Sequence, residues 1–383
     1  MAPASPLSLA IFCKVVDNYG DIGICWRLAR QLQREHGVAV SLWVDDLASF
    51  RRICPAVAPA LAAQSVENVT VRHWRGQDDA YEPADVADIV IEFFACDIPP
   101  LYIEAMARCT PRPVWLNLEG LTAEEWVEGC HTLPSMHPRL KLTKHFFFPG
   151  FTSRTGGLLR EAGLEHERRA FIDEAQKRPF LRGLGLPDAE IDALLVSLFC
   201  YPDAPVADVF AAWQGGADKI TCLVPEGVAA QAVAAFLGSQ AQAGAVATRG
   251  ALTVRVLPFV PQPDYDRLLW VCDLNFVRGE DSWVRAQWAG KPFVWHIYPQ
   301  DEDLHHKKLR AFLARYAPDI DSVQGFMLHW NGAQAGAADW PVLWPALLAD
   351  RARIAARSID WQARMLANGD LATNLLAFAA SLR

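Results

Sequence analysis

The chain has 383 residues, a formal net charge of -8 and a hydrophobic content of 52%. This length suffices for two domains of roughly 150 to 200 residues, and the apolar content for a core in each. The acidic balance argues against binding of duplex nucleic acid, which requires a basic face to neutralise phosphates. It suits a basic protein partner better, so we expect no nucleic-acid ligand.

Nine cysteines are scattered through apolar stretches without a CxxC pair. We expect them to be reduced core residues, which with the lack of a cleavable signal peptide indicates the cytoplasm. No apolar run reaches the roughly 18 residues that a transmembrane helix needs, so we expect no membrane span. The pair His305 and His306 lies in HHKKLR, which is typical of a solvated helix, and we expect no metal site.

The first half of the chain alternates expected strands and helices. The apolar run 9–16 predicts a strand, and the turn DNYGD separates it from a helix over 22–36, whose apolar residues recur on one face. Gly37 ends that helix. Further strands are expected at 38–44, 69–73, 88–94 and 113–118.

A second series follows a charged helical segment, 161–188, whose RGLGLP stretch at 182–187 predicts the domain joint. Expected elements of this series are strands at 193–201, 219–224 and 252–257 and helices near 229–237 and 265–271. The segment from 340 to the end is helical without strand patterns. Alternating strands and helices in both halves predict two α/β, Rossmann-like domains.

The most informative stretch is 276–297, FVRGEDSWVRAQWAGKPFVWHI. An apolar strand runs into a polar turn that opens a helix, which Gly290 ends. Asp281 and Ser282 are good N-cap types, and Arg278 adds positive charge to the unpaired helix-start amides, so the turn predicts a phosphate or pyrophosphate site. An ordinary βαβ unit with a solvated turn is the alternative. Glu280 favours the functional interpretation, because its carboxylate is placed to accept hydrogen bonds from a sugar.

Two Rossmann-like domains facing a cleft, without a GxGxxG fingerprint, indicate a glycosyltransferase of GT-B architecture. We place the acceptor-binding domain at 1–184 and the nucleotide-sugar domain at 188–361. The last helix, about 362–383, is expected to pack back on the first domain.

Four stretches carry a resemblance to a known family: FCKVVDNYGDIGICWRLARQL, FFACDIP, LPFVPQPDYDRLLW and RGEDSWVRAQWAGKPFVWHIYPQDE. Together they closely resemble the bacterial EarP family, which rhamnosylates one arginine of translation elongation factor P. The resemblance covers both domains. It implies an inverting, metal-independent protein-arginine rhamnosyltransferase with elongation factor P as protein partner. The co-substrate would be dTDP-β-L-rhamnose, without a cofactor.

The resemblance also implies the site residues. Asp17 and Asp21 match two essential aspartates, and Glu280 matches an acidic residue needed for activity. We assign Asp21 as the base and Asp17 as its orienting partner. The donor site is implied at Asn18, Tyr19, Gly20, Phe199, Tyr201, Phe259, Gln262, Arg278, Gly279, Asp281, Ser282 and Tyr298.

Some positions depart from the family pattern. Tyr19 and Trp283 stand where phenylalanine is expected, and both keep a ring. Gly120 stands where an aromatic residue is expected, which puts any acceptor or packing role of that position in doubt.

Structural alternatives remain open for these residues. Asp21 suits a helix N-cap and Asp17 suits a turn, while the aromatic residues of the donor set suit core packing. Glu280 has two candidate roles, which are to accept from a rhamnose hydroxyl or to steady the acceptor arginine.

Other functions make different demands on the sequence. A dehydrogenase or epimerase would need a glycine fingerprint where this chain has DNYGD. A non-catalytic binding module would bind TDP, and Asp21→Ala would change nothing in a turnover assay. The closest alternative is a GT-B enzyme that transfers a TDP-sugar to a different protein or to a small molecule.

Overall fold

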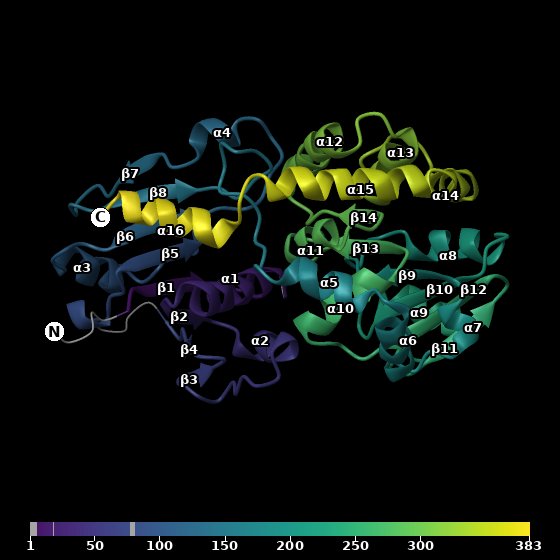
Figure 1. The fold of residues 1–383 in the computed structure, drawn as a ribbon, viewed down its shortest axis with the longest axis horizontal. Coiled ribbons are helices and arrows are strands. Elements are labelled where there is room, and N and C mark those ends of the chain that lie inside the picture. Colours follow the sequence, from purple (N-terminus) through teal and green to yellow (C-terminus); the bar gives the residue numbers. More distant parts are fainter. Residues whose placement is uncertain (1–5, 18, 77–80) are drawn as a thin grey trace. The chain divides into compact units, whose positions relative to one another are not determined.

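The computed structural model describes residues 6–17, 19–76 and 81–383. Their contacts divide the chain into two units, of which the first comprises the residues up to Ala162 together with Met365–Arg383 and the second comprises Gly163–Arg364. Each unit is built on one parallel-rich sheet with helices on its faces (Figure 1). The expected α/β class is thereby confirmed.

The first unit contains an eight-stranded sheet with the order β3-β4-β2-β1-β5-β6-β8-β7. Only the edge pairs β3–β4 and β7–β8 are antiparallel. Its strands are β1 (Ser8–Cys13), β2 (Ala39–Val44), β3 (Ala63–Val66), β4 (Val69–His73), β5 (Ile89–Phe93), β6 (Val114–Leu118), β7 (Pro134–Met136) and β8 (Thr143–Phe147). Its helices are α1 (Gly20–His36), α2 (Leu47–Ile53), the 3-10 turn η1 (Pro83–Asp85), α3 (Pro100–Arg108), α4 (Val127–Cys130) and α16 (Leu371–Ser381).

The first strand and helix have other limits than the sequence predicts. β1 ends at Cys13, and α1 begins at Gly20, with Gly37 in a left-handed conformation at its end. The strand stops early because the amides of Val15 and Val16 donate to the carboxylates of Asp45 and Asp21 instead of to a neighbouring strand. The strand that we expected over 9–16 is therefore a shorter strand, followed by a loop that side chains hold.

The second unit contains a six-stranded sheet with the order β11-β12-β10-β9-β13-β14. Its strands are β9 (Leu194–Leu198), β10 (Ile220–Pro225), β11 (Val246–Arg249), β12 (Leu252–Leu257), β13 (Leu274–Arg278) and β14 (Phe293–His296). Its helices are α5 (Leu164–Phe171), α6 (Glu174–Gly183), α7 (Asp188–Ile191), α8 (Val206–Gln214), α9 (Ala230–Leu237), α10 (Gln262–Val271), α11 (Asp281–Ala289), the 3-10 turn η2 (Asp301–Asp303), α12 (Leu304–Tyr316), α13 (Asp321–Trp330), α14 (Trp340–Ala349) and α15 (Arg351–Leu366).

The boundary between the units falls earlier than the joint expected at 182–187. Leu181 and Leu186 are buried in one hydrophobic cluster with Leu195 and Leu223 of the second sheet. Residues 163–184, expected in the first domain, therefore belong to the second unit, because their apolar side chains complete its core.

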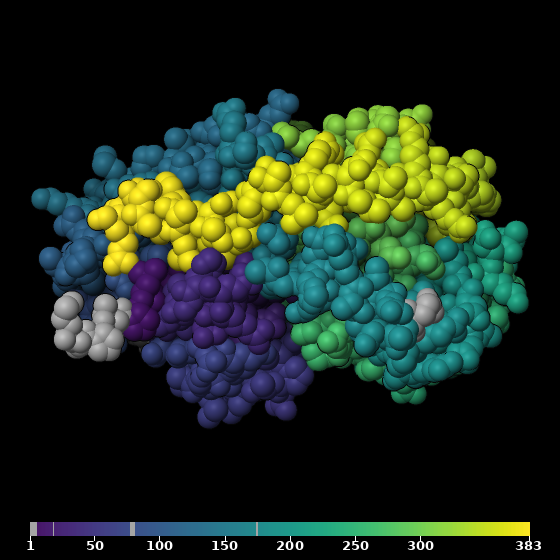
Figure 2. Space-filling view, in the orientation of Figure 1, coloured from purple at the N-terminus to yellow at the C-terminus, as the bar shows by residue number. Residues whose placement is uncertain are grey.

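The C-terminal helix α16 packs within the first unit. Gln31 of α1 donates to the carboxylate of Asp370 at 3.0 Å, and the amide of Leu371 donates to the carbonyl of Leu158 at 3.0 Å. Figure 2 shows the yellow C-terminal segment next to the purple segment that contains α1.

All nine cysteines are free thiols, and seven of them are buried. Within the described ranges, no helix combines the length and the apolar character that crossing a membrane requires.

Candidate active site

In the second unit, a tight turn joins β13 to α11. Gly279 has a φ of +57°, and Glu280 occupies the N-cap position of α11. Ser282 accepts from the amide of Arg278 at 2.9 Å and donates to the same residue's carbonyl at 2.5 Å. Asp281 and Ser282 thus lie in the first turn of α11, and neither is the N-cap that we expected, because Glu280 occupies that position. The hydroxyl of Ser282 bonds to the backbone of Arg278 instead. The start of α11 still presents the positive end of the helix dipole.

The guanidinium of Arg278 lies between two aromatic rings that follow β9. Its central carbon is 4.5 Å from the ring centre of Phe199 and 4.6 Å from that of Tyr201. Its Nη1 donates to the carbonyl of Cys200 at 3.2 Å. Cation–π contacts of this kind hold the charge in place while leaving further guanidinium donors for an anion. Tyr298, which is 41% exposed, meets the ring of Tyr201 edge to face at 5.5 Å.

The turn after β12 brings a third segment to the same sheet edge. Gln262 begins α10, is buried, and donates to the Asp281 carboxylate at 3.4 Å. Phe259 is half-buried in the preceding turn. The structure thus brings the predicted donor residues of the second unit to the carboxyl ends of β9, β12, β13 and β14. In open α/β sheets, ligands bind at this edge.

Buried contacts fix α11 beneath the turn. Arg285 donates to both carboxylate oxygens of Asp266, at 3.0 and 2.8 Å, and both side chains are buried. Trp283 stacks on Trp295 with ring centres 3.6 Å apart. The indole of Trp295 donates to the carbonyl of Gly279 at 2.8 Å. The ring at position 283, expected as phenylalanine in the family, therefore packs beneath the turn between β13 and α11.

His296 at the end of β14 was absent from the predicted set. It is 3% exposed, and its Nδ1 accepts from the amide of Tyr201 at 3.2 Å. Burial lowers the pKa of His296 to about 4. A lone histidine in the apolar run FVWHI suggests only a core residue, so the sequence carries no signal for this contact.

In the first unit, the Asp21 carboxylate anchors the loop between β1 and α1. Its Oδ2 accepts from the amides of Val16 at 2.7 Å and Asp17 at 2.8 Å. Asp21 is 5% exposed, and burial raises its pKa, with the neighbouring charges of Asp17 and Asp45 acting in the same direction and the two hydrogen bonds opposing it. Asp21 is not the N-cap of α1, which is Tyr19. Its carboxylate instead holds the preceding loop.

Asp17 and Gly20 are in close contact. The amide of Gly20 donates to the carbonyl of Asp17 at 2.6 Å, so Asp17 does form a turn. A Cβ at position 20 would lie 2.7 Å from the Oδ2 of Asp17, so any residue other than glycine would displace that carboxylate. The Arg52 guanidinium lies 5.7 Å from the ring centre of Tyr19. Asn18 lies outside the described residues.

The sheet order places this loop where strand order reverses. β1 pairs with β2 on one side and β5 on the other, so the loops after β1 and β5 meet at one switch point. In the loop after β5, Phe94, Ala95 and Asp97 all have positive φ. The amide of Ala95 is held by the buried Asn117 at 3.0 Å. Strained non-glycine residues cluster at functional sites, so the loop after β5 is a candidate for contact with a ligand at this switch point.

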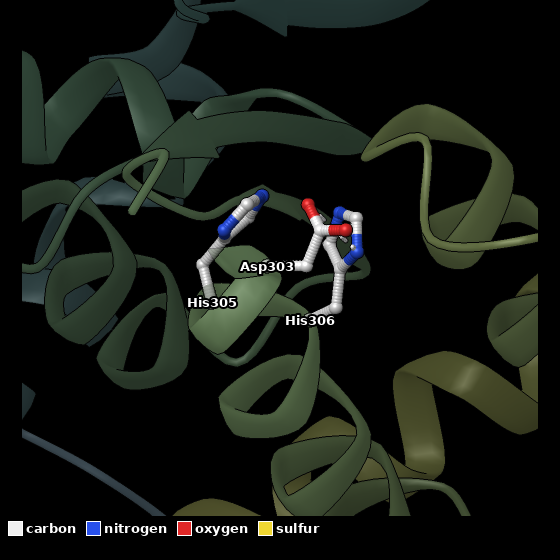
Figure 3. Close-up of side chains that lie close together, drawn as sticks. All are labelled: Asp303, His305 and His306. Carbon is white, nitrogen blue, oxygen red and sulfur yellow. Dashed lines mark ion pairs between the residues drawn. The ribbon is translucent and has the colours of Figure 1, made fainter. Parts of the chain in front are cut away.

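Among the described residues, one group could hold a metal ion: Asp303, His305 and His306, whose ligand atoms lie within 4.8 Å of one another (Figure 3). The Nε2 of His306 lies 3.0 Å from the carbonyl of Asn331, to which it must donate. The Nδ1 of His305 lies 3.1 Å from the amide nitrogen and 3.2 Å from the carbonyl oxygen of Gln300, so either neutral tautomer of the ring finds a partner there. Asp303 is exposed and both histidines are only half-buried, so we assign no metal to this group.

A cavity of about 790 Å³ lies at the opposite edge of the second sheet. It is lined by residues at the starts of strands, among them Leu194, Lys219 and Leu274. The candidate site residues follow the ends of these strands, so this cavity does not belong to the site.

The chain is similar to known proteins over nearly its whole length. The family model described as Elongation-Factor P (EF-P) rhamnosyltransferase EarP matches residues 9–380. A protein-arginine rhamnosyltransferase of Pseudomonas putida is 50% identical over 378 residues, which cover 96% of this chain and 97% of the relative.

Solved structures agree with this match. A structure of EarP, concerned with arginine glycosylation of translation elongation factor EF-P, is 37% identical with a TM-score of 0.67 and covers 98% of this chain and 99% of its own. The spinosyn rhamnosyltransferase SpnG, complexed with thymidine diphosphate, has a TM-score of 0.54 at 13% identity and covers 97% of this chain and 99% of its own. The latter likeness concerns the fold alone and confirms the GT-B class. With the family model matched from the first strand to the last helix, and a relative of 50% identity over nearly the whole length, the chain belongs to the EarP family of EF-P rhamnosyltransferases.

Proposed function

We propose that this protein transfers L-rhamnose, with inversion, from dTDP-β-L-rhamnose to one arginine side chain of elongation factor P. The observation that carries the proposal is the match of the EF-P rhamnosyltransferase family over residues 9–380. The relative from Pseudomonas putida is named a protein-arginine rhamnosyltransferase, which supports the same reaction. Because the acceptor is a translation factor, we place the protein in the cytoplasm, with neither nucleic acid nor membrane as a partner.

The second unit would hold the donor. We assign the diphosphate to Arg278, Asp281 and Ser282, where the start of α11 and a fixed guanidinium both favour negative charge. The base would lie against Phe259 and Gln262. As the anomeric C–O bond breaks, the diphosphate gains charge, and donors already aimed at it stabilise the transition state without reorganisation. Charge compensation of this kind requires no metal ion.

The first unit would hold the acceptor. A guanidinium is protonated in proteins and is a poor nucleophile, so a base must take a proton as the new bond forms. We assign this role to Asp21 and the alignment of the guanidinium to Asp17. The backbone amides of Val16 and Asp17 occupy Oδ2 of Asp21, which leaves Oδ1 as the oxygen for the proton. The raised pKa of Asp21 makes it a stronger base than an exposed aspartate.

The reaction balances with these groups alone. The arginine nitrogen forms a bond to the anomeric carbon, the bond to the diphosphate oxygen breaks with its electron pair, and the nitrogen proton passes to Asp21. The nitrogen attacks from the face opposite the diphosphate, so the anomeric configuration inverts. Asn18, Tyr19 and Gly20 would line the sugar at this centre.

Glu280 would act at the sugar or at the acceptor. Its position at the N-cap of α11, next to Arg278, places it beside the proposed diphosphate site. From there its carboxylate can accept from a rhamnose hydroxyl or from the acceptor guanidinium, and the two roles differ in which substrate's KM responds to Glu280→Gln.

The experiment that tests the function is mass spectrometry of elongation factor P from the same organism after incubation with this protein and dTDP-β-L-rhamnose. We expect a gain of one deoxyhexose, located by fragment ions on one arginine. Unmodified elongation factor P, with TDP binding still detected by calorimetry, would contradict the acceptor and leave a nucleotide-sugar enzyme with a different acceptor.

A further inference from the structure

His296 accepts a hydrogen bond from the backbone of the donor site. Its Nδ1 lies 3.2 Å from the amide nitrogen of Tyr201. A backbone amide can only donate, so Nδ1 carries the lone pair and the proton of the neutral ring is on Nε2. That nitrogen lies 3.8 Å from a carboxylate oxygen of Asp203. The tautomer of His296 is therefore set by its two neighbours.

The ring of His296 also positions the ring of Tyr201. The two ring centres are 5.3 Å apart in an edge-to-face contact. On its other sides, Tyr201 meets Tyr298 at 5.5 Å and the Arg278 guanidinium at 4.6 Å. The histidine thus fixes both the backbone and the side chain of one of the two rings that hold Arg278.

The backbone of His296 reaches the other side of the same arginine. His296 is the register partner of Arg278 in the pairing of β14 with β13. Its carbonyl accepts from the amide of Gly279 at 3.0 Å. One residue therefore joins the segment after β9, which carries Tyr201, to the turn after β13, which carries Arg278.

Core packing alone does not account for a histidine at this position. The side chain is 3% exposed and also touches Trp330, so an apolar residue would fill the space. However, an apolar residue would leave the buried amide of Tyr201 without its acceptor, which destabilises that conformation. The imidazole therefore adds a specific bond to the packing.

We propose that His296 is a positioning residue for the nucleotide-sugar donor. Through Nδ1 it holds Tyr201, and through Tyr201 it holds Arg278 in the geometry that binds the diphosphate. The inference rests on the proposed function, in which Arg278 contacts that diphosphate.

The test compares three substitutions. His296→Leu removes the acceptor, His296→Asn places Oδ1 near the position of Nδ1, and His296→Gln places its amide near Nε2 instead. For the leucine and glutamine variants, we expect the Kd for TDP and the KM for dTDP-β-L-rhamnose to rise about tenfold, the effect of losing one buried hydrogen bond. The asparagine variant should recover most of this loss. The KM for elongation factor P should stay unchanged in all three.

A matched control is His329→Ala, which removes a half-buried histidine from α13 of the same unit. It should bind TDP like the wild type. TDP binding is measured by calorimetry, independently of sugar transfer, and thermal unfolding is followed in parallel.

Two results would overturn the inference: wild-type TDP affinity in a folded leucine variant, or an asparagine variant that binds as weakly as the glutamine variant. If the leucine variant does not fold, the comparison of asparagine with glutamine decides. A wild-type protein that binds no TDP would instead reject the proposed donor site, and this inference with it.

Discussion

Asp21→Asn separates the chemical role of Asp21 from its structural role. In the structure, Oδ2 accepts from the amides of Val16 and Asp17. The side-chain oxygen of asparagine can accept the same two bonds, because the two residues have the same shape. The amide cannot take a proton from the acceptor arginine. The substitution should therefore preserve the loop and remove the base.

The expected loss of turnover follows from the general-base role. Positioned general bases contribute about 10²- to 10⁴-fold, or about 3 to 5 kcal/mol of the barrier. The Kd for TDP should not change, because Arg278 and the start of α11 belong to the second unit. Turnover should thus fall while TDP binding persists.

The thermal stability of the same variant should not fall with its turnover. Burial raises the pKa of Asp21, so the folded protein favours the protonated carboxyl. The stabilisation is fully present below the pKa of the unfolded chain, about 3.9, and is lost as pH rises through the higher pKa of the folded state. Asparagine carries no charge at any pH. The variant's Tm at pH 7 should equal or exceed that of the wild type, and this advantage should disappear in acid.

The assay measures the rate of deoxyhexose addition to elongation factor P at saturating donor, by intact mass. Asp45→Asn is the matched control, because the Asp45 carboxylate holds the same loop through the amide of Val15 at 2.8 Å. It should retain turnover within a few-fold. If Asp21→Asn retained turnover within about tenfold of the wild type, the base assignment would be refuted.

Four further outcomes are expected. Arg278→Ala should weaken TDP binding by about 1.5 to 3 kcal/mol, the contribution of a charged hydrogen-bond donor, and calorimetry giving the wild-type Kd would sink that contact. Glu280→Gln should lower turnover with an unchanged Kd for TDP, which lacks the sugar. A raised KM for the donor would assign Glu280 to rhamnose, a raised KM for elongation factor P would assign it to the acceptor, and full activity would rule out both. Gly20→Ala should reduce turnover, because the new Cβ would lie 2.7 Å from the Oδ2 of Asp17 and would displace that carboxylate. The Tm should not fall, because alanine favours the helix more than glycine does. Unaltered kinetics would show that the position of Asp17 does not matter for the reaction. EDTA should leave turnover unchanged, and inhibition reversed by a divalent cation would contradict charge compensation by Arg278 and the helix alone.

Local patterns were enough to predict much of the fold. The helix over 22–36 corresponds to α1, and the apolar run 252–257 matches β12. These elements can be recognised in the sequence because their apolar residues repeat with the period of a helix or a buried strand. Gly37 and Gly290 mark helix ends because each adopts a left-handed conformation there. Residues 163–184 were misplaced because helical periodicity does not say which core an amphipathic segment will join.

For the candidate site, the sequence determined which residue types are present and tertiary structure decided what they contact. The RGEDS turn predicts an anion site because it lies between a strand and a helix, and the family resemblance implies the two aspartates. Three features could not be predicted from the sequence. They are the position of the Arg278 guanidinium between two aromatic rings, the hydrogen bond of His296 with Tyr201, and the burial that raises the pKa of Asp21. The contacts of Arg278 and His296 join segments that are distant in the chain. A pattern along the sequence reports only the spacing of residues within one segment. Hydrogen bonds and burial depend instead on which segments the sheet brings side by side.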